Sequence, residues 1–265
     1  MNLMINGVLG QMGQEVVKLC GLGYRGACFA VGVDPEAQKS DTGTVIYRTL
    51  NEVVNFADID CIIDFSHHAS TSALVLFARE NKLPVVICTT GHTDEELSFI
   101  SRLSDVVPVF ISANMSLGVA LLVELAKTAA LAMPEAEIEI IEKHHNRKID
   151  APSGTALMIA DAICDVRPNA YTNLGRSGQD KRTAAEIGIH AVRMGNIVGE
   201  HEVIIGTENQ TITLKHEAHS RALFAEGALA AAEFIIGRDA GLYDMKSLVS
   251  GEVCSINRSF VEETL

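Results

Sequence analysis

The sequence concentrates three formal cations and two imidazoles in six consecutive residues, Lys143-His144-His145-Asn146-Arg147-Lys148. The whole chain carries a formal net charge of −13, so this local excess of positive charge indicates an anionic ligand. Imidazole and ammonium groups can also deliver protons near neutral pH if burial and mutual repulsion lower the pKa of the lysine. His144 and Lys148 are therefore the candidates for proton transfer.

A helix start follows this cationic run. Ser153 stands where a helix cap is expected, before a helical pattern that covers Ala156 to Cys164. Gly154 and Thr155 would offer backbone amides at the positive end of that helix. Side-chain cations and a helix terminus can together hold two anionic groups, which predicts a small dicarboxylate as the ligand.

Two alternatives remain for the cationic run. A charge run at the end of a strand can be an ordinary solvated turn, and adjacent histidines can indicate a metal site. Neighbours on a strand point to opposite faces, however, and no H-x-x-x-H pair or cysteine partner occurs nearby. We therefore predict no metal site. His67 and His68 follow another predicted strand and are expected to line the cofactor.

A second candidate site lies in Gly7-Val8-Leu9-Gly10-Gln11-Met12-Gly13, between the first predicted strand and helix. Such glycines let backbone amides approach a pyrophosphate at a helix N-terminus. Asp34 closes the second predicted strand 21 residues after Gly13, where a ribose-binding acid is expected. Together they predict a dinucleotide site. In the alternative interpretation, the glycines form only a tight turn, and Asp34 begins a turn with Pro35.

The type of dinucleotide depends on the residues after Asp34. A 2′-phosphate usually requires an arginine directly after the acidic residue, but Pro35 occupies that position. Lys39 is the nearest cation downstream and could reach a 2′-phosphate, or it could be an ordinary surface lysine. We therefore expect NADH to be used well and NADPH also to be accepted.

Short apolar runs alternate with helical patterns in the first half of the chain. This alternation predicts an α/β fold with a Rossmann-like, doubly wound parallel sheet. The predicted strands are Leu3–Asn6, Cys28–Val33, Cys61–Phe65, Val85–Thr89 and Val107–Ser112. The predicted helices are Met12–Cys20, Ala69–Asn81 and Asp94–Ser104, the last opened by a capping box at Thr93 and Glu96.

The pattern changes after Asn114. A long apolar helix, Leu117–Ala132, precedes alternating strands at Glu137–Lys143, Ile187–Val192, Val203–Thr207 and Thr211–Leu214, with a turn at Glu208-Asn209 and an exposed loop at Arg167–Arg182. These strands predict a second, α+β domain with a mixed open sheet. An alanine-rich helix, Leu223–Ile236, returns to the first pattern. We predict a dinucleotide-binding domain of residues 1–115 with 223–265, and a substrate-binding and oligomerisation domain of residues 116–222.

Composition excludes several classes of protein. The chain has 265 residues, 48% of them hydrophobic, which is enough for a sizeable core in one or two domains. Its acidic balance argues against a nucleic-acid partner, and no apolar run reaches the length of a membrane span. The first residues lack the features of a signal peptide. The six cysteines are far apart, so we expect them to be reduced and buried in a cytoplasmic protein.

The segment from Glu139 to Leu157, EIIEKHHNRKIDAPSGTAL, resembles the characteristic motif of the dihydrodipicolinate reductases of lysine biosynthesis, now called 4-hydroxy-tetrahydrodipicolinate reductases. Further matches follow in the family's order and cover nearly the whole chain, among them Asp64-Phe65-Ser66, Ser112 to Val119 and Gly195 to His201. The resemblance implies NADH- or NADPH-dependent reduction of 4-hydroxy-tetrahydrodipicolinate to tetrahydrodipicolinate in the diaminopimelate route. It also implies a homotetramer joined through the open sheets.

The resemblance assigns roles residue by residue. It implies that His144 is the proton donor or acceptor and that Lys148 is a second proton donor. It implies substrate binding by His145, Gly154 and Thr155. The cofactor-binding stretches it implies are Gly7, Val8, Leu9, Gly10, Gln11 and Met12, then Asp34, then Cys88, Thr89 and Thr90, and finally Ser112, Ala113, Asn114 and Met115.

Three residues depart from the family's pattern. Gln11 and Pro35 stand where many members carry arginine, which puts a preference for NADPH in doubt, and Cys88 stands where glycine is usual. Two other functions stay open: an oxidoreductase acting on another small anionic imine or keto acid, and a nucleotide-sensing or structural protein with a dead site. A sensor needs no proton donor, so the presence of both His144 and Lys148 argues against the last.

Overall fold

The computed structural model describes residues 1–37, 46–54 and 57–251. It divides into two compact units, one formed by Met1–Leu117 together with the chain from Ala222 onward, and one formed by Gly118–Arg221. Lys39 and Cys254, which were considered from the sequence, lie outside the described residues.

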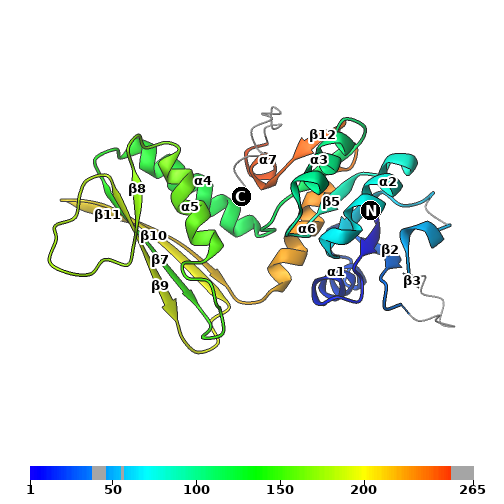
Figure 1. The fold of residues 1–265 in the computed structure, drawn as a ribbon, viewed down its shortest axis with the longest axis horizontal. Coiled ribbons are helices and arrows are strands. Elements are labelled where there is room, and N and C mark those ends of the chain that lie inside the picture. The colour runs from blue at the N-terminus through cyan, green and yellow to red at the C-terminus, as the bar shows by residue number, and fades with distance from the viewer. Residues whose placement is uncertain (38–45, 55–56, 252–265) are drawn as a thin grey trace. The chain divides into compact units, whose positions relative to one another are not determined.

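The first unit is built on a parallel sheet in the order β12-β6-β5-β4-β1-β2-β3 (Figure 1). Its strands are β1 (Asn2–Asn6), β2 (Cys28–Val33), β3 (Ile46–Tyr47), β4 (Cys61–Asp64), β5 (Val85–Ile87), β6 (Pro108–Ile111) and β12 (Gly241–Tyr243). Its helices are α1 (Gln11–Gly21), α2 (Thr71–Asn81), α3 (Asp94–Leu103), α6 (Ala222–Ile235) and α7 (Met245–Ser250), with short 3₁₀ turns at Tyr24–Gly26, Leu50–Glu52 and His68–Ser70. The predicted Rossmann-like fold is confirmed.

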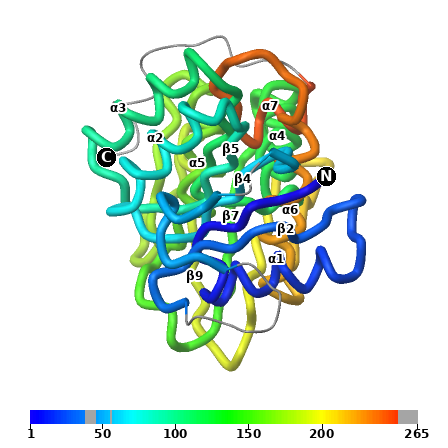
Figure 2. Tube along the Cα trace, turned by 90° about the vertical axis from the view of Figure 1, so that its right-hand side faces the viewer, coloured from blue at the N-terminus to red at the C-terminus, as the bar shows by residue number. Residues whose placement is uncertain are grey.

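Helices cover the central strands on both faces. Helix α2 packs with α3, and α1 packs with α6, and Figure 2 shows these two pairs on different sides of the strands. Leu3, Ile62 and Val85 are fully buried as a consequence. This is why β1, β4 and β5 are continuous apolar runs instead of alternating ones. The capping box predicted for α3 is present, because Thr93 and Glu96 exchange hydrogen bonds at its start.

The second unit is a mixed sheet in the order β11-β10-β7-β9-β8. Its strands are β7 (Glu137–His144), β8 (Tyr171–Leu174), β9 (Glu186–Arg193), β10 (Gly199–Thr207) and β11 (Gln210–Ala218). Strand β7 is parallel to β9 and antiparallel to β10. Helices α4 (Leu117–Ala132) and α5 (Gly154–Cys164) pack on one face of this sheet and form its core with β7, β9 and β10 (Figure 1).

Some sequence predictions need correction. The stretch Arg167–Arg182 is not only an exposed loop, because it contains edge strand β8, whose short and polar sequence gives no alternating apolar signal. Strands β3 and β12 are also too short to be found by pattern. Cys28 is exposed instead of buried, although no disulfide forms among the cysteines within the described ranges. No helix among the described residues combines the length and hydrophobicity of a transmembrane segment.

Candidate functional site

The glycine loop of the first unit is packed too tightly for side chains. Gly7 adopts a φ of +81°, and a Cβ there would lie 2.5 Å from the carbonyl oxygen of Phe65. A Cβ on Gly13 would lie 2.2 Å from the carbonyl oxygen of Gly7. Gly10 precedes α1 without any side-chain cap. The loop therefore presents backbone groups at the positive end of α1, which is the arrangement that binds a pyrophosphate.

Asp34 connects this loop to the end of β2. Its side chain is buried, and one carboxylate oxygen accepts the Leu9 N–H at 3.0 Å. The other oxygen accepts the Glu36 N–H at 3.0 Å in the turn that begins at Pro35. The turn that the sequence offered as an alternative is thus present together with the contact to the glycine loop, and Asp34 stands where a ribose hydroxyl is bound in dinucleotide sites.

A cavity of about 420 Å³ lies beside Asp34. Its wall contains Gly7, Gly10, Pro35 and Arg48. The Arg48 Nε donates a hydrogen bond to the Pro35 carbonyl oxygen at 3.3 Å, so an exposed guanidinium stands beside the residue that follows Asp34. A glycine-lined cradle with a carboxylate and a cation on one wall fits the phosphate and ribose of a dinucleotide.

The carboxyl ends of β1, β4 and β5 are joined by one buried carboxyl group. Asp64 accepts hydrogen bonds from Asn6 Nδ2 at 2.7 Å and from Thr89 Oγ1 at 2.6 Å, and Ser66 Oγ donates to it at 2.6 Å. Burial raises the pKa of Asp64, although these donors oppose the shift. The Asp64 network fixes the strand ends where an open α/β sheet binds its ligand.

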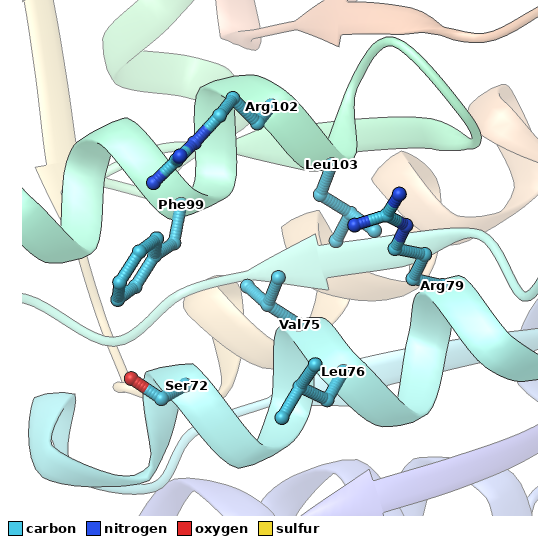
Figure 3. Close-up of a pocket in the computed structure, with 7 residues that line it drawn as sticks. All are labelled: Ser72, Val75, Leu76, Arg79, Phe99, Arg102 and Leu103. Carbon is cyan, nitrogen blue, oxygen red and sulfur yellow. The ribbon is translucent and has the colours of Figure 1, made fainter.

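A second cavity of this unit lies between α2 and α3 (Figure 3). It measures about 330 Å³, and its lining is mainly apolar, with Val75, Leu76 and Phe99. The Arg102 guanidinium lies over the Phe99 ring at 4.9 Å from the ring centroid. This groove has no glycine loop and no carboxylate, and it is not the nucleotide site.

The second unit holds the predicted proton-transfer residue at the end of β7. His144 is nearly buried, and its Nδ1 lies 2.6 Å from Glu142 Oε2. The His144 ring also packs edge-on against the His201 ring at 5.2 Å between centroids. Burial, and next the neighbouring His144, lower the pKa of His201 to about 4, so His201 is neutral at pH 7. The His201 Nε2 lies 3.0 Å from Ser153 Oγ.

The cationic run forms a turn directly after His144. The His145 N–H donates to the Ile197 carbonyl oxygen at 2.8 Å, which ties this turn to the loop before β10. Partial burial, and next Arg147, lower the pKa of the His145 imidazole. The Lys148 ammonium lies 2.8 Å from an Asp150 carboxylate oxygen, and this contact lowers the pKa of Asp150. Lys148 therefore stands as an ion pair in this structure.

Helix α5 begins where the sequence predicts. Ser153 caps it, since its Oγ accepts the Ala156 N–H at 3.3 Å. Gly154 and Thr155 form the first turn at the positive end of the helix. Because Ser153 also contacts His201, whose ring packs on His144, the helix start and the predicted proton-transfer residue belong to one connected arrangement.

Both halves of the chain match models of one protein family. Residues 1–115 match the model described as dihydrodipicolinate reductase, N-terminus, and residues 118–249 match dihydrodipicolinate reductase, C-terminus. The chain belongs to the dihydrodipicolinate reductase family. This family consists of nicotinamide-dependent oxidoreductases of lysine and diaminopimelate biosynthesis, so the function class predicted from the resemblance is confirmed.

The similarity to individual relatives extends over nearly the whole chain. The 4-hydroxy-tetrahydrodipicolinate reductase of Caldanaerobacter subterraneus subsp. tengcongensis is 48% identical over 249 residues, covering 93% of this chain and 97% of the relative. That of Clostridium novyi is 41% identical, covering 94% and 98%. A dipicolinate-bound dihydrodipicolinate reductase from Paenisporosarcina sp. TG-14 superimposes with a TM-score of 0.78 at 25% identity, covering 92% and 97%.

The predicted cofactor residues of this family member fall into two groups. Gly7, Gly10 and Asp34 line the cavity, and Val8, Leu9, Gln11 and Met12 belong to the same loop and helix start. The others follow β5 and β6 at the carboxyl edge of the sheet, outside the lining of that cavity: Cys88, Thr89, Thr90, Ser112, Ala113, Asn114 and Met115. Cys88 and Met115 are buried, so they can offer mainly backbone groups.

Sequence reasoning missed several residues. Arg48 follows a two-residue strand, and only the packing of that strand beside β2 brings it near Asp34. The buried Glu142 and the partly buried Arg193 form an ion pair with an N–O distance of 2.6 Å, although 51 positions separate them. Glu142 carried a signal, because a carboxylate two positions before His144 shares its face of the strand. Arg193 carried no such signal in the sequence.

We predict that Asp34→Ala raises the Michaelis constant for the cofactor about tenfold, because hydrogen bonds to a charged group contribute roughly 1.5–3 kcal/mol. Steady-state kinetics at saturating substrate and titration of cofactor fluorescence measure the effect. Asp60→Ala is the control, because Asp60 also accepts a backbone N–H, that of Asn2, but on the exposed surface. An unchanged constant in Asp34→Ala would show that the carboxylate only forms the turn.

Proposed function

We propose that the protein reduces 4-hydroxy-tetrahydrodipicolinate to tetrahydrodipicolinate with NADH or NADPH, and that His144 transfers the proton of this reaction. The observation that supports the proposal best is the end of β7. There a nearly buried imidazole on a buried carboxylate stands next to a cationic turn and a capped helix start. The glycine loop and Asp34 of the other unit supply the second requirement, a dinucleotide cradle.

The second unit is suited to bind a small dicarboxylate. The first turn of α5, with Gly154 and Thr155, offers a positive helix end to one carboxylate. His145 and Lys148 lie in the turn after β7 and can hold the other. The structural relative from Paenisporosarcina is bound to dipicolinate, a ligand of this class. Fixing both carboxylates orients the ring, which is what hydride transfer requires of the protein.

We assign the proton transfer to His144. A nicotinamide held by the glycine loop and Asp34 would supply the hydride, and the substrate ring would then need a proton at an enamine-like position. The His144 Nδ1 is held by Glu142, so its Nε2 is the nitrogen that can carry and release this proton. Lys148 lies in the turn after His144, where its ion pair with Asp150 holds the ammonium group. From there it can act as a carboxylate clamp or as a second proton donor.

An enzyme assay tests the reaction. The preceding synthase generates the substrate in the same cuvette, and loss of NADH or NADPH absorbance reports turnover. We expect oxidation of the cofactor only when the synthase and its substrates are present. Turnover with another keto acid instead would select a different oxidoreductase, and cofactor binding without turnover would indicate a nucleotide sensor.

The cavity wall supports the use of both cofactors. Asp34 stands where the ribose hydroxyls of NADH are recognised. Pro35 removes the arginine that usually follows, but the Arg48 guanidinium bonds to the Pro35 carbonyl oxygen and lies in the same wall. An arginine fork pairs well with a phosphate. Arg48 therefore compensates for the arginine that Pro35 replaces.

We expect Arg48→Ala to weaken NADPH binding about tenfold and NADH binding less than twofold, because only NADPH carries the 2′-phosphate that Arg48 would contact. Fluorescence titration of both cofactors measures the two dissociation constants directly. Arg102→Ala is the matched control, since Arg102 is an exposed arginine of the same unit that lines the other groove. Equal weakening of both cofactors would contradict selection by Arg48.

A homotetramer in the cytoplasm completes the proposal. The face of the second sheet that α4 and α5 leave open carries Lys143 and Lys215, which both pair with Glu200 at 3.1 Å. A sheet face that no helix covers can be covered by a second copy of the chain, and charged residues of this kind belong at the rim of such an interface. Light scattering after size-exclusion chromatography should give about four times the chain mass of 28.5 kDa. A monomer at micromolar concentration would remove this part of the proposal.

A further inference from the structure

The face of β7 that the helices cover changes from apolar to polar along the strand. Ile138 and Ile140 lie in the apolar core of the second unit, and the next two residues on the same face are Glu142 and His144. Glu142 is 0% exposed. A buried carboxylate costs several kcal/mol unless it is paired and hydrogen-bonded, so its partners must explain why it is there.

Glu142 has partners on both oxygens. Arg193 of β9, which is paired in register with His144, donates one guanidinium N–H to each oxygen at 2.6 and 2.7 Å. The Ser153 N–H donates to Oε1 at 2.9 Å. Burial alone would raise the pKa of Glu142, but the donors Arg193, His144 and Ser153 outweigh it, and the pKa is lowered. Glu142 is therefore an ionised carboxylate.

An ionised carboxylate can only accept hydrogen bonds. The His144 Nδ1 lies 2.6 Å from Glu142 Oε2, so the proton of this contact sits on Nδ1. The neutral imidazole then keeps its lone pair on Nε2. Gly199 leaves this nitrogen accessible, because a Cβ at that position would lie 3.1 Å from Nε2.

We propose that Glu142 is a positioning residue that fixes the His144 tautomer and at the same time anchors the start of α5. This inference rests on the proposed role of His144. As a proton donor, His144 carries hydrogens on both nitrogens and its positive charge faces Glu142. Release of the Nε2 proton to the substrate leaves a neutral ring with its hydrogen on Nδ1. The same carboxylate holds the Ser153 N–H, so it places Gly154 and Thr155 in register with His144.

Glu142→Gln tests this assignment with little change in shape. Ser153 and one Arg193 N–H donate to Oε1, so the amide oxygen takes that position. The NH₂ group then faces His144 Nδ1 and the second Arg193 N–H, which loses its acceptor. The amide then donates to Nδ1 and forces the hydrogen of His144 onto Nε2, the wrong nitrogen for accepting a proton there.

The following measurements distinguish a positioning role of Glu142 from a general structural role. Nitrogen NMR of histidine-labelled protein, assigned with His144→Gln, should show Nδ1–H in the wild type and Nε2–H in Glu142→Gln. In Glu142→Gln, kcat should fall about 10²-fold or more, while the cofactor dissociation constant stays within twofold. The charged and titratable groups around His144 are Glu142, His201, Arg193, His145 and Lys148.

A matched control lies on the same strand. Glu139 also pairs with a histidine and an arginine, His190 at 2.9 Å and Arg182, but on the open face of the sheet. Glu139→Gln should leave the His144 spectrum and kcat unchanged. An unchanged His144 spectrum and kcat in Glu142→Gln would overturn the inference, even if His144→Ala is inactive. If Glu142→Gln does not fold, an Nε2–H tautomer in the neutral wild-type enzyme overturns it by itself.

Discussion

Replacing His144 with alanine should lower kcat by about 10²- to 10⁴-fold, the range that a positioned proton-transfer group supplies. The cofactor dissociation constant should stay within twofold, because the glycine loop, Asp34 and their cavity belong to the other unit. Stopped-flow measurement of cofactor oxidation and fluorescence titration report the two quantities separately.

The control for this variant is His190→Ala, which removes a partly exposed histidine from neighbouring strand β9 without touching Glu142. Its kcat should stay near that of the wild type. Equal losses of turnover and cofactor affinity in His144→Ala would contradict the assigned role, because they would indicate a general structural defect instead of a lost proton transfer.

Acid should destabilise the protein through His201. Its pKa is about 4 in the folded state against a usual value of 6.5, so between these values the unfolded chain binds a proton that the folded chain does not. Stability is therefore complete above pH 6.5 and decreases as pH falls towards 4, by up to about 3 kcal/mol in total. Protonation is opposed by burial and by His144, His216 and Lys148, and is favoured by Glu142.

Urea unfolding at several pH values measures this slope. His201→Gln should lower the loss of unfolding free energy between pH 6.5 and 4.5 by about 2 kcal/mol, because glutamine does not titrate. His190→Gln, which removes a partly exposed histidine of the same sheet, is the control for general effects of such a substitution. The same slope in wild type and His201→Gln would show that His201 takes up its proton in the folded state as readily as in the unfolded one.

Local patterns were sufficient to predict most of the fold. The glycine loop, the apolar strands and the capping box each act over a few residues, so the sequence alone predicts the parallel sheet and the start of α5. Strand β8 was missed because Tyr171–Leu174 is mostly exposed and is held by its pairing to β9. Its place depends on a partner that the sequence pattern does not reveal.

Local sequence patterns also predicted part of the candidate site, namely the residues that are recognised by type and spacing. The residue types and spacing of His144 and Lys148 indicate candidates for proton transfer, and the position of Ser153 before a helical pattern predicts a helix cap. The groups that give these residues their properties are distant in the chain. Arg193 reaches Glu142 only through the β7–β9 pairing, and Arg48 reaches Pro35 only through the β2–β3 pairing. Such partners follow from tertiary structure and not from local periodicity.

The parallel pairing of β7 with β9 also sets an order of events during synthesis. Parallel neighbours need a long crossover, and here Arg193 follows Glu142 by 51 positions. A nascent chain that ends before β9 has no counter-ion for Glu142, and the polar end of β7 must then stay hydrated. The proposed proton-transfer centre consequently forms late, after β9 has left the ribosome, so a truncated translation product carries the His144 motif without the Arg193 partner of Glu142.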